Sequence, residues 1–179
     1  MGKNVLIISA SPRRNGNSDT LCNRFMEGAR ESGNTVEKIF LKDKKISYCT
    51  GCGYCFEAHK CSQKDDMAEI LEKMIAADVI VLATPVYFYS MDAQMKCFID
   101  RTTPRYTEMT DKEFYFILAA ADTDKKNLHR TMETFRGFTE DCLEGAKEAG
   151  IIYGVGAWNM GDVQNTLAYN EAYEMGKQV

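Results

Sequence analysis

Long apolar runs and long basic runs are both missing from this sequence. No apolar stretch approaches the roughly 20 residues that a helix needs to span a bilayer. The first apolar run, Val5–Ile8, is too short for a signal peptide and is followed directly by a polar loop. A net charge of −4 without a basic cluster argues against nucleic-acid binding. We therefore expect a cytoplasmic globular protein that binds neither membranes nor nucleic acids.

Internal repeats, low-complexity tracts and linker-like segments are also missing. The chain has 179 residues, of which 45% are apolar and 27% charged, and this balance is ordinary for a globular protein. A chain of this length forms one domain by default and can bury a sizeable core. We expect a single domain over residues 1–179.

Short apolar runs alternate with amphipathic helical patterns, which predicts a parallel sheet covered by helices on both faces. The capping-box spacing of Asp66 and Glu69 marks the start of one helix. The expected strands cover residues 5–8, 35–41, 79–83, 114–121 and 151–155. The expected helices cover residues 18–32, 65–77, 93–101 and 128–149, with a last helix from about 163. Five such units predict a three-layer α/β/α sandwich with a five-stranded parallel sheet in the order 2-1-3-4-5.

Ligands of such sheets bind beyond the carboxyl ends of the strands, where the first and third strands diverge. Three loops meet there, and they follow Ile8, Ala83 and Ala121. Two of these loops have an unusual composition, and they are the candidates for a binding site.

The first loop, Ser9–Ser18, is rich in hydrogen-bond donors and opens directly into a helix. It carries the hydroxyls of Ser9, Ser11 and Ser18 and the guanidinium of Arg13, and Gly16 permits a tight turn. A helix start offers free N–H groups and a partial positive charge to a phosphate. The loop lacks both the Gly-x-Gly-x-x-Gly and the Gly-Lys-Ser/Thr patterns, so a terminal monophosphate fits it best. The alternative is an ordinary polar loop that ends in a serine cap.

The loop after the third strand contains three consecutive aromatic residues, Tyr87, Phe88 and Tyr89. Aromatic side chains are costly to expose, so we expect them to cover a flat ligand such as an isoalloxazine ring. Pro85 stiffens the entry to this loop. The alternative is that the aromatic residues pack the domain or a subunit contact.

These two loops, together with the spacing of the strands, resemble the NAD(P)H-dependent FMN reductases and the related iron–sulfur flavoproteins. The resemblance covers about residues 5–155 and implies a flavodoxin-like fold, bound FMN, NAD(P)H as co-substrate and a homodimer. It implies phosphate contacts from Ser11, Arg13, Asn17 and Ser18, to which Ser9 is added from the loop. It also implies that Pro85, Val86, Tyr87 and Phe88 lie along the flavin ring. Asp122, in the third loop, matches by position only.

Four of the seven cysteines fall within thirteen residues, at positions Cys49, Cys52, Cys55 and Cys61. Cys-x2-Cys steps suit thiolate ligation of zinc or of a [4Fe–4S] cluster, and the spacing resembles the compact motif of iron–sulfur flavoproteins. Many FMN reductases that this chain resembles carry similar cysteines without a cluster as a family property. A cluster, zinc, and free or redox-active thiols are therefore three open alternatives.

The expected activity is the transfer of hydride from NAD(P)H to FMN, and then of electrons to a small acceptor such as a flavin or quinone, or to a protein. Flavin chemistry requires no catalytic triad, and none is evident. The alternative is a non-enzymatic electron carrier that combines FMN with a [4Fe–4S] cluster. Trp158, the only tryptophan, follows the last strand and either lies near the cofactor or fills a gap.

Overall fold

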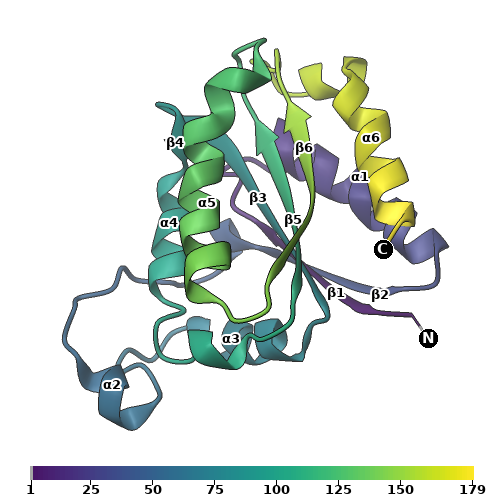
Figure 1. Cartoon of the computed structure of the whole chain (residues 1–179). Coiled ribbons are helices and arrows are strands. Elements are labelled where there is room, and N and C mark those ends of the chain that lie inside the picture. The colour runs from purple at the N-terminus through teal and green to yellow at the C-terminus, as the bar shows by residue number, and fades with distance from the viewer. Residues whose placement is uncertain (1) are drawn as a thin grey trace.

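The computed structural model describes residues 2–179 and forms a three-layer α/β/α sandwich (Figure 1). The strands are β1 (Asn4–Ser9), β2 (Thr35–Phe40), β3 (Val79–Tyr87), β4 (Ser90–Met91), β5 (Glu113–Ala119) and β6 (Lys147–Gly154). The α-helices are α1 (Asn17–Glu31), α2 (Tyr54–Ala58), α3 (Met67–Ala76), α4 (Ala93–Asp100), α5 (His129–Cys142) and α6 (Leu167–Lys177). Short 3₁₀ turns cover 41–43, 106–108, 125–128 and 162–165.

The central sheet has the order β2-β1-β3-β5-β6, and all neighbouring pairs in it are parallel. This is the predicted 2-1-3-4-5 order, because β4 pairs only with the end of β3, in the antiparallel direction. In register, Val5 lies beside Val79 and Val79 beside Glu113. The α/β fold class is confirmed.

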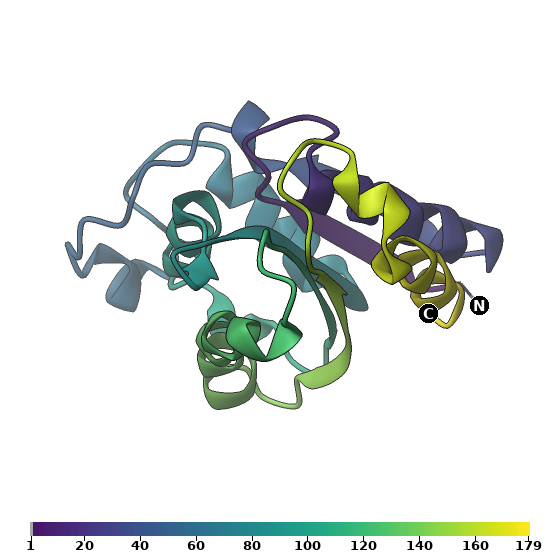
Figure 2. The same ribbon diagram turned by 90° about the horizontal axis from the view of Figure 1, so that it is seen from above.

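Successive side chains of each strand point to opposite faces of the sheet, so the core consists of two layers. On one face, Leu6, Ile8, Ile80 and Leu82 pack against α3, α4 and α5. On the other face, Val5, Ile7, Val79, Val81 and Ile117 pack against α1 and α6. Figure 2 shows these two helical layers on opposite sides of the sheet. Because both faces are covered, the strands are apolar at successive positions rather than alternating with polar residues.

The capping box predicted at Asp66 and the predicted end of the fourth helix were wrong. Asp66 precedes α3 but makes no side-chain cap; its carboxylate accepts the Lys45 N–H instead, at 2.7 Å. The fourth predicted helix stops at Cys142, and its last predicted residue, Ala149, belongs to β6. Gly145, with φ +69°, turns the chain there.

The third strand continues through Pro85 to Tyr87 and folds back as a tight hairpin onto β4. Phe88 and Tyr89 form its two-residue turn, with φ values of 50° and 61°. This turn geometry favours Asn and Gly, so the sequence indicated an open loop rather than a hairpin. None of the helices in residues 2–179 combines the length and the hydrophobicity that a membrane span requires.

Candidate functional site

A cavity of about 330 Å³ lies at the carboxyl ends of β1, β3, β5 and β6. It brings together Ser11, Arg13, Asn17 and Ser18 from the first loop with Pro85, Val86 and Tyr87 from the third strand. Seven of the ten predicted cofactor residues therefore line one cavity. The other lining residues are Pro12, Ala119, Ala120, Ala121, Ala157, Trp158, Asn159 and Met160.

One end of this cavity is formed by the first turn of α1. The backbone N–H groups of Asn17, Ser18 and Asp19 have no acceptor among residues 2–179. The Ser18 side chain is 1% exposed, and its hydroxyl also has no partner in the described chain. A buried hydroxyl without a hydrogen bond is costly unless a ligand supplies one. These four donors fit the oxygens of a phosphate monoester.

The turn before α1 is held by its own hydrogen bonds. The Ser11 hydroxyl donates to the Arg13 carbonyl oxygen at 2.7 Å and accepts the Arg13 N–H at 3.2 Å. A Cβ on Gly16 would come within 2.7 Å of the Ser11 Oγ, so this position requires glycine through close approach. Its own φ is −63°, and the left-handed residue of the loop is Asn15. The Arg13 side chain stays exposed at the cavity rim.

Asp19 would place a negative charge beside an anion, but Lys38 neutralises it. The Lys38 ammonium lies 2.7 Å from the buried Asp19 carboxylate, which also accepts the Asn15 N–H and the Ser9 hydroxyl. Ser9 is thus fully buried beneath the loop and does not line the cavity. The sequence suggested no role for Lys38, because a lysine on an edge strand is usually a solvated residue.

The other end of the cavity is apolar. Pro85, Val86 and Tyr87 line it at the end of β3, while Phe88 points away at the tip of the hairpin and is 101% exposed. The hairpin base is fixed by Thr84 and Asp92: the Thr84 hydroxyl accepts the Asp92 N–H, and the Asp92 carboxylate caps α4 by accepting the Met95 N–H, both at 3.0 Å. Burial raises the pKa of Asp92 to about 6, against the lowering effect of the hydrogen bonds that its carboxylate accepts from the Met95 N–H and the Thr84 hydroxyl.

Asp122 lies beside the cavity without lining it. Its carboxylate accepts hydrogen bonds from the Asp124 N–H and the Asn127 amide, both at 2.9 Å, and these bonds lower its pKa. Its carbonyl oxygen accepts the Gly156 N–H at 2.7 Å. Asp122 therefore ties the loop after β5 to the segment after β6.

Residues 157–160 complete the cavity, and no sequence pattern indicated this role for the segment as a whole. The Asn17 amide donates to the carbonyl oxygens of Ala157 at 3.1 Å and Asn159 at 2.9 Å. Its oxygen accepts the N–H groups of Gly161 at 3.1 Å and Val163 at 3.4 Å. The Asn17 side chain therefore positions this loop, and only its backbone N–H is left for a phosphate. Trp158, the only tryptophan of the sequence, lies at the cavity rim, which agrees with a place near the cofactor and not with one in a packing gap.

The four clustered cysteines surround a separate hollow of about 80 Å³, with which the first cavity shares no lining residue. They lie on a loop that projects from the sandwich and carries α2 (Figure 1). All the cysteines are free, and no three Cys, His, Asp or Glu side chains among residues 2–179 are grouped as ligands of a metal ion. The donor type and number suit a thiolate-bound centre, but the thiols as placed do not converge on one. The Tyr54 N–H and the Ser62 hydroxyl lower the pKa of the Cys52 thiol.

The buried side chain of Arg101 holds the loop that carries the four clustered cysteines. This side chain is 2% exposed, and its terminal nitrogens lie 2.7 and 2.9 Å from the two Asp65 carboxylate oxygens. It also donates to the Ser47 carbonyl oxygen at 2.6 Å and lies 3.5 Å from the Cys61 sulfur. The partner of Arg101 is Asp65, whereas Asp100 pairs with Lys96 on the surface.

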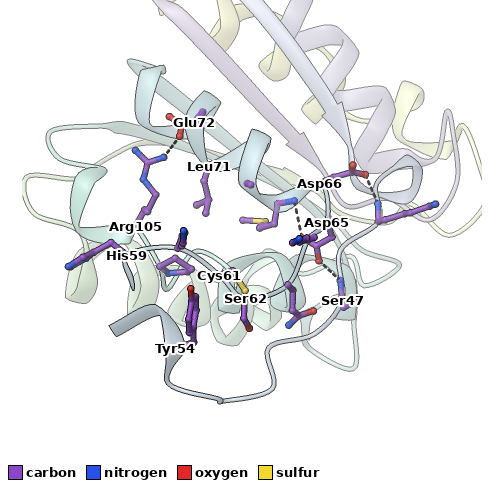
Figure 3. A pocket seen from close by; sticks show the side chains of 17 residues that line it. Ser47, Tyr54, His59, Cys61, Ser62, Asp65, Asp66, Leu71, Glu72 and Arg105 are labelled. Carbon is purple, nitrogen blue, oxygen red and sulfur yellow. Dashed lines mark hydrogen bonds and ion pairs between the residues drawn. The ribbon is translucent and has the colours of Figure 1, made fainter. Parts of the chain in front are cut away.

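A larger, open cavity of about 1120 Å³ lies between the cysteine loop and α3. Figure 3 shows Tyr54, His59 and Cys61 on one side of it and Leu71 and Glu72 on the other. Among its charged groups, Arg105 pairs with Glu72, and Asp65 pairs with Arg101, which lies outside the cavity. It contains no buried, unpartnered polar group comparable to Ser18 among the described residues. The first cavity is therefore the better candidate for a cofactor site.

Known proteins resemble this chain both in sequence and in fold. An iron-sulfur flavoprotein of Archaeoglobus fulgidus is 43% identical over 97 residues, which are 54% of this chain and 44% of that protein. The chain spans about half the length of the curated relatives it matches.

Two solved structures share the fold over nearly the whole of both chains. An NAD(P)H:quinone oxidoreductase from Methanothermobacter marburgensis has a TM-score of 0.77 at 17% identity, covering 99% of this chain and 97% of the other. An FMN-dependent NADH-azoreductase from Bacillus anthracis in complex with FMN has a TM-score of 0.72 at 20% identity, covering 99% of each chain. The family model described as NADPH-dependent FMN reductase matches residues 3–136. The chain belongs to the NADPH-dependent FMN reductase family.

Proposed function

We propose that this protein is an FMN-dependent oxidoreductase that takes hydride from NAD(P)H and passes electrons to a small acceptor such as a flavin or quinone. One observation carries the proposal. Ser18, whose buried hydroxyl has no partner in the described chain, lines the same cavity as the apolar end of β3, and it belongs to a helix start with three free N–H groups. A ligand with a phosphate at one end and a planar ring at the other satisfies both ends.

The residues of the cavity divide into two groups. Ser18, the N–H groups of α1 and the Arg13 guanidinium hold the phosphate, and the Ser11 hydroxyl keeps the turn in shape. Pro85, Val86 and Tyr87 contact the ring. The flavin supplies hydride and electron transfer when bound, so the chain needs no acid–base residue of its own. The work of the protein is to bind and orient the ring and to leave one part of it accessible.

Comparison of FMN with riboflavin tests this assignment, because the two differ only in the phosphate. We expect one FMN to bind per chain in a titration followed by flavin fluorescence, and riboflavin to bind far more weakly. Inorganic phosphate should compete with FMN. A protein that binds neither flavin, or that binds both equally, would contradict the proposal.

A second candidate function is electron transfer through FMN and a [4Fe–4S] cluster without a reductase activity. The observation that favours it is the placement of all four clustered cysteines around one hollow, together with relatives that are named iron-sulfur flavoproteins. Iron, zinc and sulfide analysis of anaerobically prepared protein, with electron spin resonance, tests it. Four irons per chain and a reduced-cluster signal support a cluster; zinc or metal-free protein contradicts it.

A homodimer is also part of the proposal, because a neighbouring subunit could cover the exposed edge of the ring. Sedimentation equilibrium of the FMN-bound protein measures the assembly directly. A mass of one chain at micromolar concentration would contradict the dimer.

A further inference from the structure

The rim of the phosphate-binding cavity carries large apolar side chains that nothing in the described chain covers. Trp158 is 75% exposed, and Met160 and Tyr87 beside the same cavity are also exposed. Clustered exposed apolar side chains usually mark a ligand or partner surface. Here they surround a cavity whose opposite end carries unsatisfied donors, so a ligand that enters the cavity is the occupant that accounts for both features.

The backbone that carries Trp158 is tightly fixed, although its side chain is not. The Asp162 carboxylate accepts the N–H groups of Trp158 at 3.1 Å and Asn159 at 2.6 Å. Asn17 binds the same loop through four further hydrogen bonds. Because the backbone beneath the exposed indole is already fixed, it loses little conformational entropy when a ligand binds. The indole therefore belongs to a surface that is preorganised for contact.

Asn17 joins the two ends of the cavity. Its backbone N–H belongs to the free donors at the start of α1, and its side chain holds the loop that presents Trp158. Asn17 therefore ties the backbone that carries the indole to the phosphate-binding donors.

We propose that Trp158 is a ring-contacting residue of this cavity, stacking on the planar ring of the phosphate-anchored flavin, and that Asn17 is the residue that positions it. This inference rests on the proposed function, since it takes FMN as the ligand. An indole presents a large aromatic face, and such faces stack on the planar rings of ligands.

Variants at position 158 test the contact by flavin fluorescence and FMN affinity, without any activity assay. An indole in contact with the flavin quenches its emission, so bound FMN should be dim in the natural protein. We expect Trp158→Ala to raise the Kd of FMN by ~10-fold and to restore flavin emission. Trp158→Phe should retain most of the affinity. Leu167→Ala is the matched control, because Leu167 is 81% exposed but lies outside the cavity.

Asn17→Ala tests the positioning role in the ligand-free protein. Trp158 is the only tryptophan, so its fluorescence anisotropy reports the loop alone. We expect the anisotropy to fall in Asn17→Ala and the affinity for FMN to weaken. Affinity for inorganic phosphate should stay the same, because the backbone N–H groups remain. An unchanged anisotropy in this variant would overturn the positioning role.

The outcomes separate the inference from the function on which it rests. If the natural protein binds FMN and Trp158→Ala binds it with the same Kd and the same quenched emission, the indole does not contact the ring and this inference alone is overturned. If the natural protein does not bind FMN, the proposed function fails, and the inference fails with it.

Discussion

The Asp65 carboxylate receives both terminal nitrogens of the buried Arg101 side chain, at 2.7 and 2.9 Å. Arg101 ends α4, and Asp65 lies just before α3, so this pair joins the two helices beneath the cysteine loop. The same guanidinium also holds the Ser47 carbonyl oxygen at the start of that loop. The path of the loop from residue 47 to residue 65 therefore depends on one buried cation.

Removal of the carboxylate should destabilise the protein strongly, because it leaves the guanidinium buried without its counter-ion. We expect Asp65→Asn to lower the free energy of unfolding by about 3 kcal/mol, measured by urea denaturation. Asp100→Asn is the matched control, because it breaks an exposed pair with Lys96 and should cost less than about 0.5 kcal/mol. Equal effects of the two variants would contradict the role assigned to Arg101.

The same pair contributes to acid sensitivity. Burial raises the pKa of Asp65, but hydrogen bonds from Arg101 and from the N–H groups of Ser47 and Met67 outweigh it and hold the pKa below its ordinary value. A carboxyl whose folded pKa is depressed stabilises the protein above its unfolded pKa, and this stability is lost as pH falls through the folded pKa. Stability should therefore decline below about pH 4, and Asp65→Asn should show a smaller decline when unfolding is measured across that range.

Asp92 should make the stability of the protein depend on pH in the opposite direction. Its folded pKa of about 6 lies above the ordinary value of an aspartate, so the folded protein binds the proton more tightly than the unfolded chain. The free energy of unfolding should fall as pH rises from about 4 to about 6. Asparagine is an equally good helix cap, so Asp92→Asn should remove this decline and be more stable than the natural protein at pH 7, by about 1–3 kcal/mol. Parallel stability profiles of the two proteins would contradict the buried, protonatable carboxyl.

Ser18→Ala should weaken FMN binding without lowering the stability of the ligand-free protein. The Ser18 hydroxyl has no partner in the described chain, so its removal should leave the unfolding free energy of the ligand-free protein unchanged or slightly raised. The Kd of FMN should rise ~10-fold, the loss of a hydrogen bond to a charged group. Thr131→Val is the control, because Thr131 also has a buried, unpartnered hydroxyl but lies on α5, outside the cavity. A loss of FMN affinity in the control, or none in Ser18→Ala, would refute this role.

The hairpin turn offers a test of the residues that lie outside the cavity. Phe88→Asn combined with Tyr89→Gly should stabilise the protein by about 1 kcal/mol, because these residues favour the positive φ values of the turn. The Kd of FMN should stay the same, since neither side chain lines the cavity. A raised Kd would instead support the contact between Phe88 and the flavin ring that the family resemblance implies.

The sequence predicted the sheet order and most of the cavity because both depend on local signals. Uninterrupted apolar runs such as Val5–Ile8 identify strands that are buried on both faces, and the donors of Ser9–Ser18 precede a helix. The contribution of residues 157–160 to the cavity could not be predicted in this way, because it depends on hydrogen bonds from Asn17 some 140 positions earlier. The pairing of Arg101 with Asp65 is equally non-local. The hairpin was missed because Phe88 and Tyr89 are unfavourable residues for its turn.

Anaerobic stopped-flow reduction of the FMN-bound protein by NADPH distinguishes a reductase from a protein that only binds flavin. We expect the visible absorbance of the oxidised flavin to disappear in a single turnover and the addition of a quinone to restore it. A bound flavin that stays oxidised in excess NADPH and NADH would contradict a reductase.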